Sequence, residues 1–183
     1  MKLLSATLAL LVTSSAFAGL LIEPYVGYAS LKGSGTANVI GLGEGEIEET
    51  TAKGVAYGGR LGYGVGPIGA GVDFMTSSLD DDGDDTKLTN LGAFAAVGLG
   101  PVRFWGTYIF SSKYELTSGD FDGTAFEGAG VKAGLGWQIL PLLSLNLEYM
   151  ALNQDEVEES DVLDEIDFDQ KGFMISISIP FVI

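Results

Sequence analysis

Residues 54–77 read GVAYGGRLGYGVGPIGAGVDFMTS, and this stretch decides the fold. Apolar side chains occupy nearly every second position from Val55 to Val65, and most positions between them hold glycine or alanine. The Gly66-Pro67 dipeptide interrupts the alternation, which then resumes. A period of two is typical of a β-strand with one apolar face, whereas a helix repeats every three to four residues. The stretch therefore predicts two antiparallel strands joined by a tight turn.

The same alternation recurs in eight segments, at about 20–31, 54–65, 68–77, 88–99, 102–112, 128–139, 142–152 and 171–182. Three connections between them are tight and carry proline, at Gly66-Pro67, Gly100-Pro101 and Leu140-Pro141. Four are longer, at about 32–53, 78–87, 113–127 and 153–170. This pattern predicts an all-β fold, an eight-stranded antiparallel up-and-down transmembrane β-barrel with short periplasmic turns and long extracellular loops. The termini are then periplasmic.

A soluble β-sandwich is the main alternative, because its strands also alternate. The second face of these segments argues against it. That face is poor in charge and rich in Gly, Ser and Ala, which suits a narrow filled lumen better than a surface in water. Larger residues on the same face, among them Tyr25, Phe94, Trp105 and Met150, are expected to fill the lumen further.

The first residues resemble a secretory signal peptide. Lys2 supplies a positive charge, an apolar run follows, and Ala16-Phe17-Ala18 is a cleavage signal of the A-x-A type. We therefore expect a signal peptide at 1–18 and an outer-membrane β-barrel domain at 19–183. An uncleaved membrane anchor is the alternative, and its apolar core is shorter than the ~20 residues that a spanning helix needs.

The composition narrows the possible functions. The chain has no cysteine and no histidine, which removes disulfide scaffolds, the usual zinc ligands and most nucleophile–base pairs. An acyl-transfer enzyme is therefore disfavoured, and we expect no enzymatic cofactor. The formal net charge is −16, so binding to the phosphate backbone of a nucleic acid is not expected.

Charged residues are segregated along the chain. Of the 25 acidic residues, 22 lie in the four long connections. The inward strand positions hold three acids and three bases, namely Glu23, Arg60, Asp73, Arg103, Lys132 and Glu148. One interpretation is a neutral salt-bridge plug, and the other is a charged eyelet or gated pore. The plug is favoured because an eight-stranded barrel is only wide enough inside for side chains.

The Asp-rich run in the second long connection permits two interpretations. Asp80, Asp82 and Asp84 surround a Gly-containing turn and offer the carboxylates that Ca²⁺ or Mg²⁺ prefers. The favoured alternative is a solvated hairpin loop, since Asp-Gly is ordinary turn chemistry. Divalent cations bridging the acidic loops to lipopolysaccharide phosphates are a further hypothesis. Direct phosphate contacts would then come from lysines at the outer strand ends, namely Lys32, Lys53, Lys87, Lys113 and Lys171.

Aromatic residues gather near the two ends of the apolar strand faces. The set expected at the membrane interfaces comprises Tyr28, Tyr57, Tyr63, Phe74, Phe104, Trp137, Tyr149, Phe173 and Phe181. Two belts of amphipathic rings are typical of transmembrane barrels, although aromatic residues also favour strands in general.

Two short segments carry a family resemblance. Residues 23–28, EPYVGY, resemble the first strand of outer-membrane barrels of the OmpA transmembrane-domain and OmpX type, a porin-like group. Residues 172–181, GFMISISIPF, resemble the C-terminal signal that the barrel-assembly machinery reads. The resemblance implies location in the outer membrane of a Gram-negative-type bacterium, with lipid, lipopolysaccharide and the assembly machinery as partners.

Three function classes follow from these observations. The favoured one is a non-enzymatic envelope protein with a plugged lumen and interacting surface loops, whose extracellular partner the sequence does not identify. The alternative is a small-solute or ion channel, and the enzyme is the third.

Overall fold

The computed structural model describes residues 17–39, 43–81, 84–117, 125–158 and 163–183. Nearly all of them lie in strands: β1 (Phe17–Val39), β2 (Gly43–Gly66), β3 (Ile68–Asp81), β4 (Asp84–Leu99), β5 (Val102–Leu116), β6 (Ala125–Leu140), β7 (Leu143–Glu158), β8 (Leu163–Ser178) and β9 (Phe181–Val182). Within these residues there is no helix with the length and apolarity needed to cross a membrane. The predicted signal peptide lies outside the described residues except for Phe17 and Ala18.

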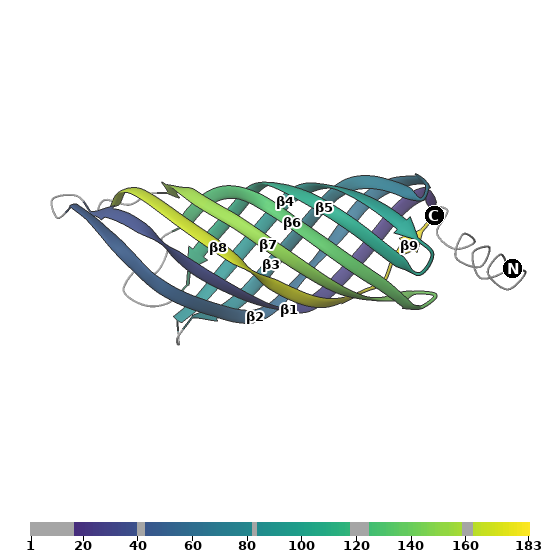
Figure 1. Ribbon diagram of the computed structural model, residues 1–183, viewed down its shortest axis with the longest axis horizontal. Coiled ribbons are helices and arrows are strands. Elements are labelled where there is room, and N and C mark those ends of the chain that lie inside the picture. The colour runs from purple at the N-terminus through teal and green to yellow at the C-terminus, as the bar shows by residue number, and fades with distance from the viewer. Residues whose placement is uncertain (1–16, 40–42, 82–83, 118–124, 159–162) are drawn as a thin grey trace, which may run out of the picture.

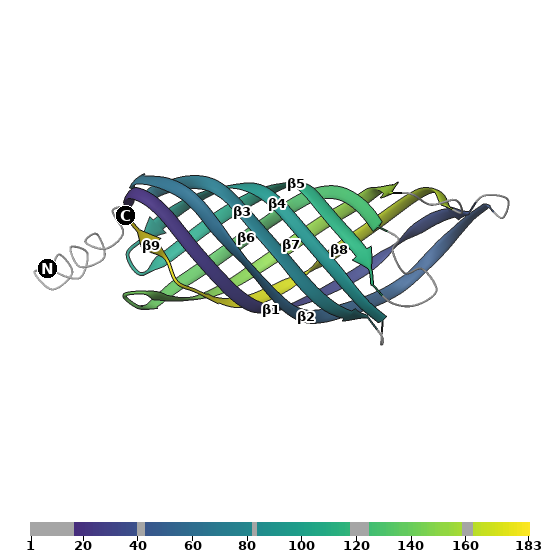
Figure 2. The same cartoon turned by 180° about the vertical axis from the view of Figure 1, so that it is seen from behind.

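The strands form one closed antiparallel barrel (Figures 1 and 2). Neighbours in sequence pair from β2 through β8, and β1 closes the sheet because it pairs with β8 on one side and β2 on the other. The β1–β2 ladder runs from the Phe17–Gly66 pair to the Val39–Gly43 pair. Closure leaves no open edge along the wall, which is what lipid requires of a spanning sheet. The predicted fold class is confirmed.

The eighth strand is built from two pieces, β8 and β9. Pro180 lies between them and has no N–H to give to a ladder, so the regular pairing stops there. The chain nevertheless stays beside β1: the N–H of Ile179 donates to the carbonyl of Pro24 at 3.0 Å, and β9 pairs with Leu21 and Ile22. The single strand expected at about 171–182 is therefore one strand with a proline break.

Two of the tight turns depend on glycine. Gly66 and Gly100 have φ values of 62° and 64°, a left-handed conformation that residues with a Cβ atom rarely adopt. Proline follows each of them, and its ring restricts the φ angle at that position. This local chemistry explains why the β2–β3 and β4–β5 connections are short.

Three of the four expected long loops are mostly strand, so their predicted lengths need correction. The connection placed at 32–53 is largely taken up by the ends of β1 and β2, and the one at 78–87 by β3 and β4. The same holds for 153–170, whereas of 113–127 only 113–116 and 125–127 lie in β5 and β6, and 118–124 lie outside the described residues. Apolar and small residues no longer alternate along these segments. Backbone pairing between adjacent strands continues nevertheless, because it does not require an apolar outer face.

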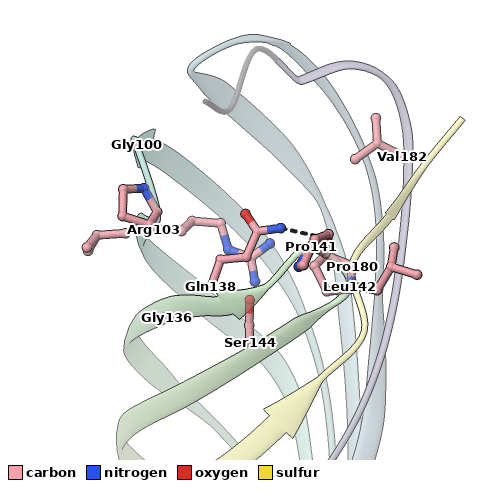
Figure 3. A pocket seen from close by; sticks show the side chains of 11 residues that line it. Gly100, Arg103, Gly136, Gln138, Pro141, Leu142, Ser144, Pro180 and Val182 are labelled. Atoms are coloured by element: carbon pink, nitrogen blue, oxygen red, sulfur yellow. Dashed lines mark hydrogen bonds between the residues drawn. The ribbon is translucent and has the colours of Figure 1, made fainter. Parts of the chain in front are cut away.

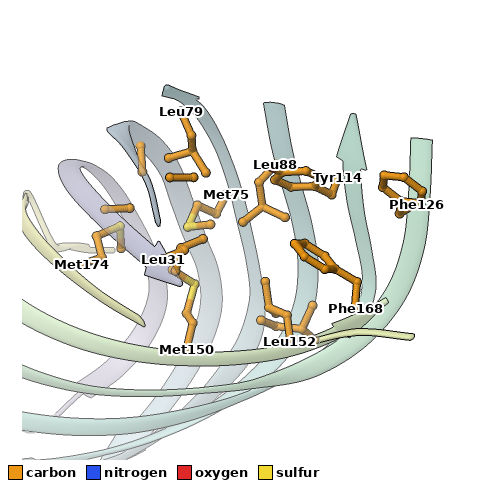
Figure 4. Packing of buried hydrophobic residues seen from close by; sticks show 14 of the residues in the cluster. Leu31, Met75, Leu79, Leu88, Tyr114, Phe126, Met150, Leu152, Phe168 and Met174 are labelled. Carbon is orange, nitrogen blue, oxygen red and sulfur yellow. The ribbon is translucent and has the colours of Figure 1, made fainter. Parts of the chain in front are cut away.

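Towards the loop end of the barrel, polar side chains lie on the outer face of the wall and apolar ones on the inner face. On β8, Phe173 and Ile175 are exposed on the outer face, whereas nearer the loop end Lys171 is exposed and Phe168 is buried inside. The interior of that end holds an apolar cluster (Figure 4), which includes Leu31, Met75, Leu79, Leu88, Tyr114, Phe126, Met150, Leu152, Phe168 and Met174. The loop end is therefore built like a water-soluble protein, and the rest like a membrane protein.

This apolar cluster is expected to contribute strongly to stability. Leu88 is 0% exposed, whereas Leu99 on the same strand is 60% exposed. Leu88→Ala should lower the free energy of unfolding by about 2–5 kcal/mol, because it leaves a cavity. The control Leu99→Ala should cost about 1 kcal/mol or less. Denaturant unfolding of the refolded barrel in detergent micelles measures both, and equal losses would contradict the assignment of Leu88 to a packed core.

Candidate functional site

The six inward charged residues lie on six different strands and meet in the lumen. Glu23, Arg60 and Asp73 form a single row, because β1 pairs Glu23 with Arg60 and β2 pairs Arg60 with Asp73. Arg103, Lys132 and Glu148 enter from β5, β6 and β7 on the remaining wall. The side chain of Arg103 is 11% exposed, and the other five are at most 2% exposed.

Arg60 is the centre of this charged layer. Its Nη2 lies 2.7 Å from Oε2 of Glu148, its Nη1 3.4 Å from Oε1 of Glu23, and its Nε 3.5 Å from Oδ2 of Asp73. One guanidinium therefore contacts all three buried carboxylates. Its planar fork of donors suits this role better than a lysine ammonium would.

The other two cations complete the pairing. Nζ of Lys132 lies 2.6 Å from Oδ2 of Asp73 and 3.1 Å from Oε2 of Glu148. Nη2 of Arg103 donates to Oε1 of Glu23. Each carboxylate thus contacts two cations, and three acids balance three bases. Such pairing is what makes burial of six charges tolerable, since an unpaired buried charge is costly.

Neutral side chains satisfy further acceptors of the network. The hydroxyl of Tyr25 donates to Asp73 at 2.9 Å, and that of Ser178 donates to Glu23 at 2.7 Å. Thr107 and Ser176 donate to Asp73 and Glu148, both at 3.3 Å. The period-two positions of these hydroxyls put them on the inward face, but periodicity alone does not show that they bond to the charged residues.

Aromatic rings enclose the central guanidinium. Cζ of Arg60 lies 4.7 Å from the ring centroid of Tyr25 and 4.3 Å from that of Trp105, a range in which cations attract aromatic faces. Gly58 and Gly134 lie against these two rings, where a Cβ atom would collide with them. Glycine on the inner face thus makes room for the aromatic residues that fill the lumen.

The charged layer lies between two apolar layers. Towards the loops is the cluster of Figure 4, and towards the turns is a smaller one of Leu21, Phe94, Ala96 and Trp105. A cavity of about 350 Å³ opens at the turn end (Figure 3), lined by Arg103, Gln138 and Ser144 among others. Arg103 therefore stands where this cavity meets the charged layer.

The predicted cation site is only partly described. Asp80 is exposed near the end of β3 and pairs with Asp85 of β4. Asp82 and the side chain of Asp84 lie outside the described residues. Among the residues that the structure describes, no group of three His, Cys, Asp or Glu side chains is placed to hold a metal ion. Calcium or magnesium binding by this turn remains a prediction.

The nine predicted interface aromatics all lie on the outer surface, with exposed fractions from 40% to 62%. Tyr149 and Phe173 contact each other, with ring centroids 5.0 Å apart. Two of the rim lysines form exposed ion pairs, Lys32 with Glu49 at 2.6 Å and Lys171 with Asp169 at 3.3 Å. Contact of these aromatics and lysines with lipid stays a prediction.

A closed wall with an apolar outer band and a filled interior that holds a buried charged layer defines the class as an eight-stranded barrel of the outer-membrane type. Solved structures share this fold. Neisserial surface protein A has 17% identity and a TM-score of 0.52, and the match covers 91% of this chain and 100% of that one. OprG from Pseudomonas aeruginosa has 12% identity and a TM-score of 0.55, with coverage of 92% and 99%.

A third match is Ail, the attachment invasion locus protein of Yersinia pestis, solved with the heparin analogue sucrose octasulfate. It has 16% identity and a TM-score of 0.56, with 89% of this chain and 99% of Ail covered. No protein-family model and no curated protein sequence matches the chain. Identities this low establish a common fold and carry no ligand over.

Removal of the central cation should destabilise the barrel strongly. Arg60→Met leaves three buried carboxylates facing only two cations and should lower the free energy of unfolding by about 3–5 kcal/mol. The control Lys32→Met removes an exposed pair and should cost about 1 kcal/mol or less. Arg60→Met combined with Glu148→Gln restores the charge balance and should regain part of the loss. Denaturant unfolding in micelles measures all three, and equal losses for the two single variants would refute the central role of Arg60.

Proposed function

We propose that this protein is a non-enzymatic integral outer-membrane barrel with a sealed lumen, which presents its strand extensions outside the cell and keeps both termini in the periplasm. The observation that carries this proposal is the buried, charge-balanced network around Arg60. A pore needs a hydrated path, whereas here six charged side chains pair with one another across the lumen. The apolar cluster of Figure 4 obstructs the path a second time.

The outer wall supports residence in a bilayer. Its exposed side chains between the turns and the rim lysines are apolar on every long strand, as with Val26, Leu61, Val72, Val97, Phe104, Leu135, Leu147 and Ile175. Aromatic residues lie among them towards both ends. A band of this kind is stable in lipid and would be a large aggregation-prone patch in water. Lipid, lipopolysaccharide and the barrel-assembly machinery are the partners that this placement implies.

The acidic rim argues against a polysulfated sugar of the kind bound to Ail. In this chain 22 acidic residues lie in the segments at and beyond the rim, and five lysines accompany them. Like charges would repel a sulfated ligand. An extracellular partner of the opposite sign is the better fit.

Because the lumen is sealed, we expect the protein to conduct no ions. The refolded protein should insert into planar bilayers without discrete channel openings. Arg103→Ala removes one of the two cationic partners of Glu23, at the inner end of the turn-side cavity, and should lower the temperature at which heating unfolds the barrel on gels. We expect that loss of stability without large currents.

The opposite result has a distinct signature. If Arg103→Ala conducts strongly while its heat-modifiable transition stays at the wild-type temperature, the network is a gate and the channel alternative holds. Gln138→Ala is the matched control, since Gln138 lines the same cavity and its side-chain amide donates to the nearby carbonyl of Pro141, outside the charged layer. It should change neither quantity.

A further inference from the structure

The strands of the barrel end at unequal heights. Pairing of β2 with β3 stops at the Lys53–Asp80 pair, but pairing of β2 with β1 continues as far as the Val39–Gly43 pair. The β1–β8 ladder also continues, to the Val39–Leu163 pair. In Figures 1 and 2 the ends of β1, β2 and β8 extend beyond the other strands. We call residues 33–39, 43–52 and 163–167 the three-strand blade.

The blade exposes a free sheet edge. Within the part of the chain that the structure describes, residues 43–47 and 50–52 of β2 pair only with β1, with a register shift at 48–49, so their opposite side faces no strand. Ten extended residues span roughly 33 Å, and about half of their N–H and C=O groups point away from the paired neighbour. An edge of this length is a template on which an extended chain adds as a further strand.

The charge of the β2 edge determines which kind of strand can pair with it. Residues 43–52 contain four glutamates and no lysine or arginine. The adjacent blade segment 163–167 adds Asp164, Glu165 and Asp167. A second copy of this chain would bring the same negative charge to the edge, and like charges opposite each other destabilise strand pairing. The acids thus discourage self-association and favour a cationic strand.

We propose that the β2 edge, residues 43–52, binds a lysine- or arginine-rich extended segment of a partner protein by strand addition. This inference rests on the proposed function, because the partner must reach the outer face of the membrane. Main-chain hydrogen bonds to the edge supply the geometry, and the glutamates supply selectivity and rapid encounter. The Lys32–Glu49 pair, 2.6 Å long, marks the membrane-side end of the site.

A synthetic probe tests the proposal. Fluorescein-labelled (Lys-Thr)₅, capped at both ends, is titrated against the refolded full chain in zwitterionic micelles and followed by anisotropy. Saturable binding is expected at 50 mM salt and several-fold weaker binding at 500 mM. The same peptide with alternate backbone amides methylated keeps its charge but cannot extend a ladder, so it should bind at least tenfold more weakly. (Glu-Thr)₅ should not bind.

Two variants of the chain provide matched controls. Replacing residues 34–49 by Asn-Gly removes all of the edge except residues 50–52 and closes a short hairpin on the Gly33–Thr50 pair, and it should weaken binding at least tenfold. Replacing Glu115 and Glu127 by glutamine removes acids on the other side of the rim and should change affinity less than twofold.

Several outcomes would overturn the proposal. Absence of binding to the wild-type barrel does so, as does equal affinity of the methylated peptide or an unchanged affinity after truncation of the hairpin. The last two would mean that the acids attract cations without strand pairing. Bilayer silence and heat modifiability are recorded on the same preparations, and channel currents in the wild-type protein would contradict the proposed function alone.

Discussion

The structure depends on one constraint: in lipid, every backbone N–H and C=O of the wall must find a partner within the protein. Pairing of β1 with both β2 and β8 meets that constraint by closing the sheet. A closed sheet of eight strands has an interior only as wide as the side chains that fill it. The glycines under Tyr25 and Trp105, the apolar layers and the paired charges all follow from that narrow interior.

The charged layer also fixes the register of the strands. Glu23, Arg60 and Asp73 are direct neighbours across β1, β2 and β3, and each has an exposed residue before or after it on its strand. A slip of one residue would turn a charge into the lipid and an apolar side chain into the network. Apolar residues of similar volume would fill the space, but a slip of register would then cost much less free energy. We regard strand register as the main benefit of keeping six ionisable groups inside.

Much of this architecture was predictable from the sequence, because lipid imposes a simple period-two rule. The rule located the eight strands and the six charged residues from Glu23 to Glu148, which the structure brings into contact. The period-two rule failed near the loop end, where the apolar side chains of the strands face inward. Leu79, Tyr114 and Phe168 are inward residues of segments that are acidic overall, so composition suggested loops. The individual partners of Arg60 depend on side-chain reach across the lumen, which strand periodicity does not contain.

The last strand ends unevenly at the turn end of the barrel. The β7–β8 ladder ends at the Ser144–Ser178 pair, and after Pro180 the described chain is paired only with β1. That corner of the wall is held from one side, and it adjoins the cavity that leads to Arg103. With fewer backbone pairs than the rest of the wall, this corner should separate more easily on heating. We therefore expect solvent to reach the charged interior first from the turn end, beside this cavity, and not through the loop end, which the apolar cluster fills.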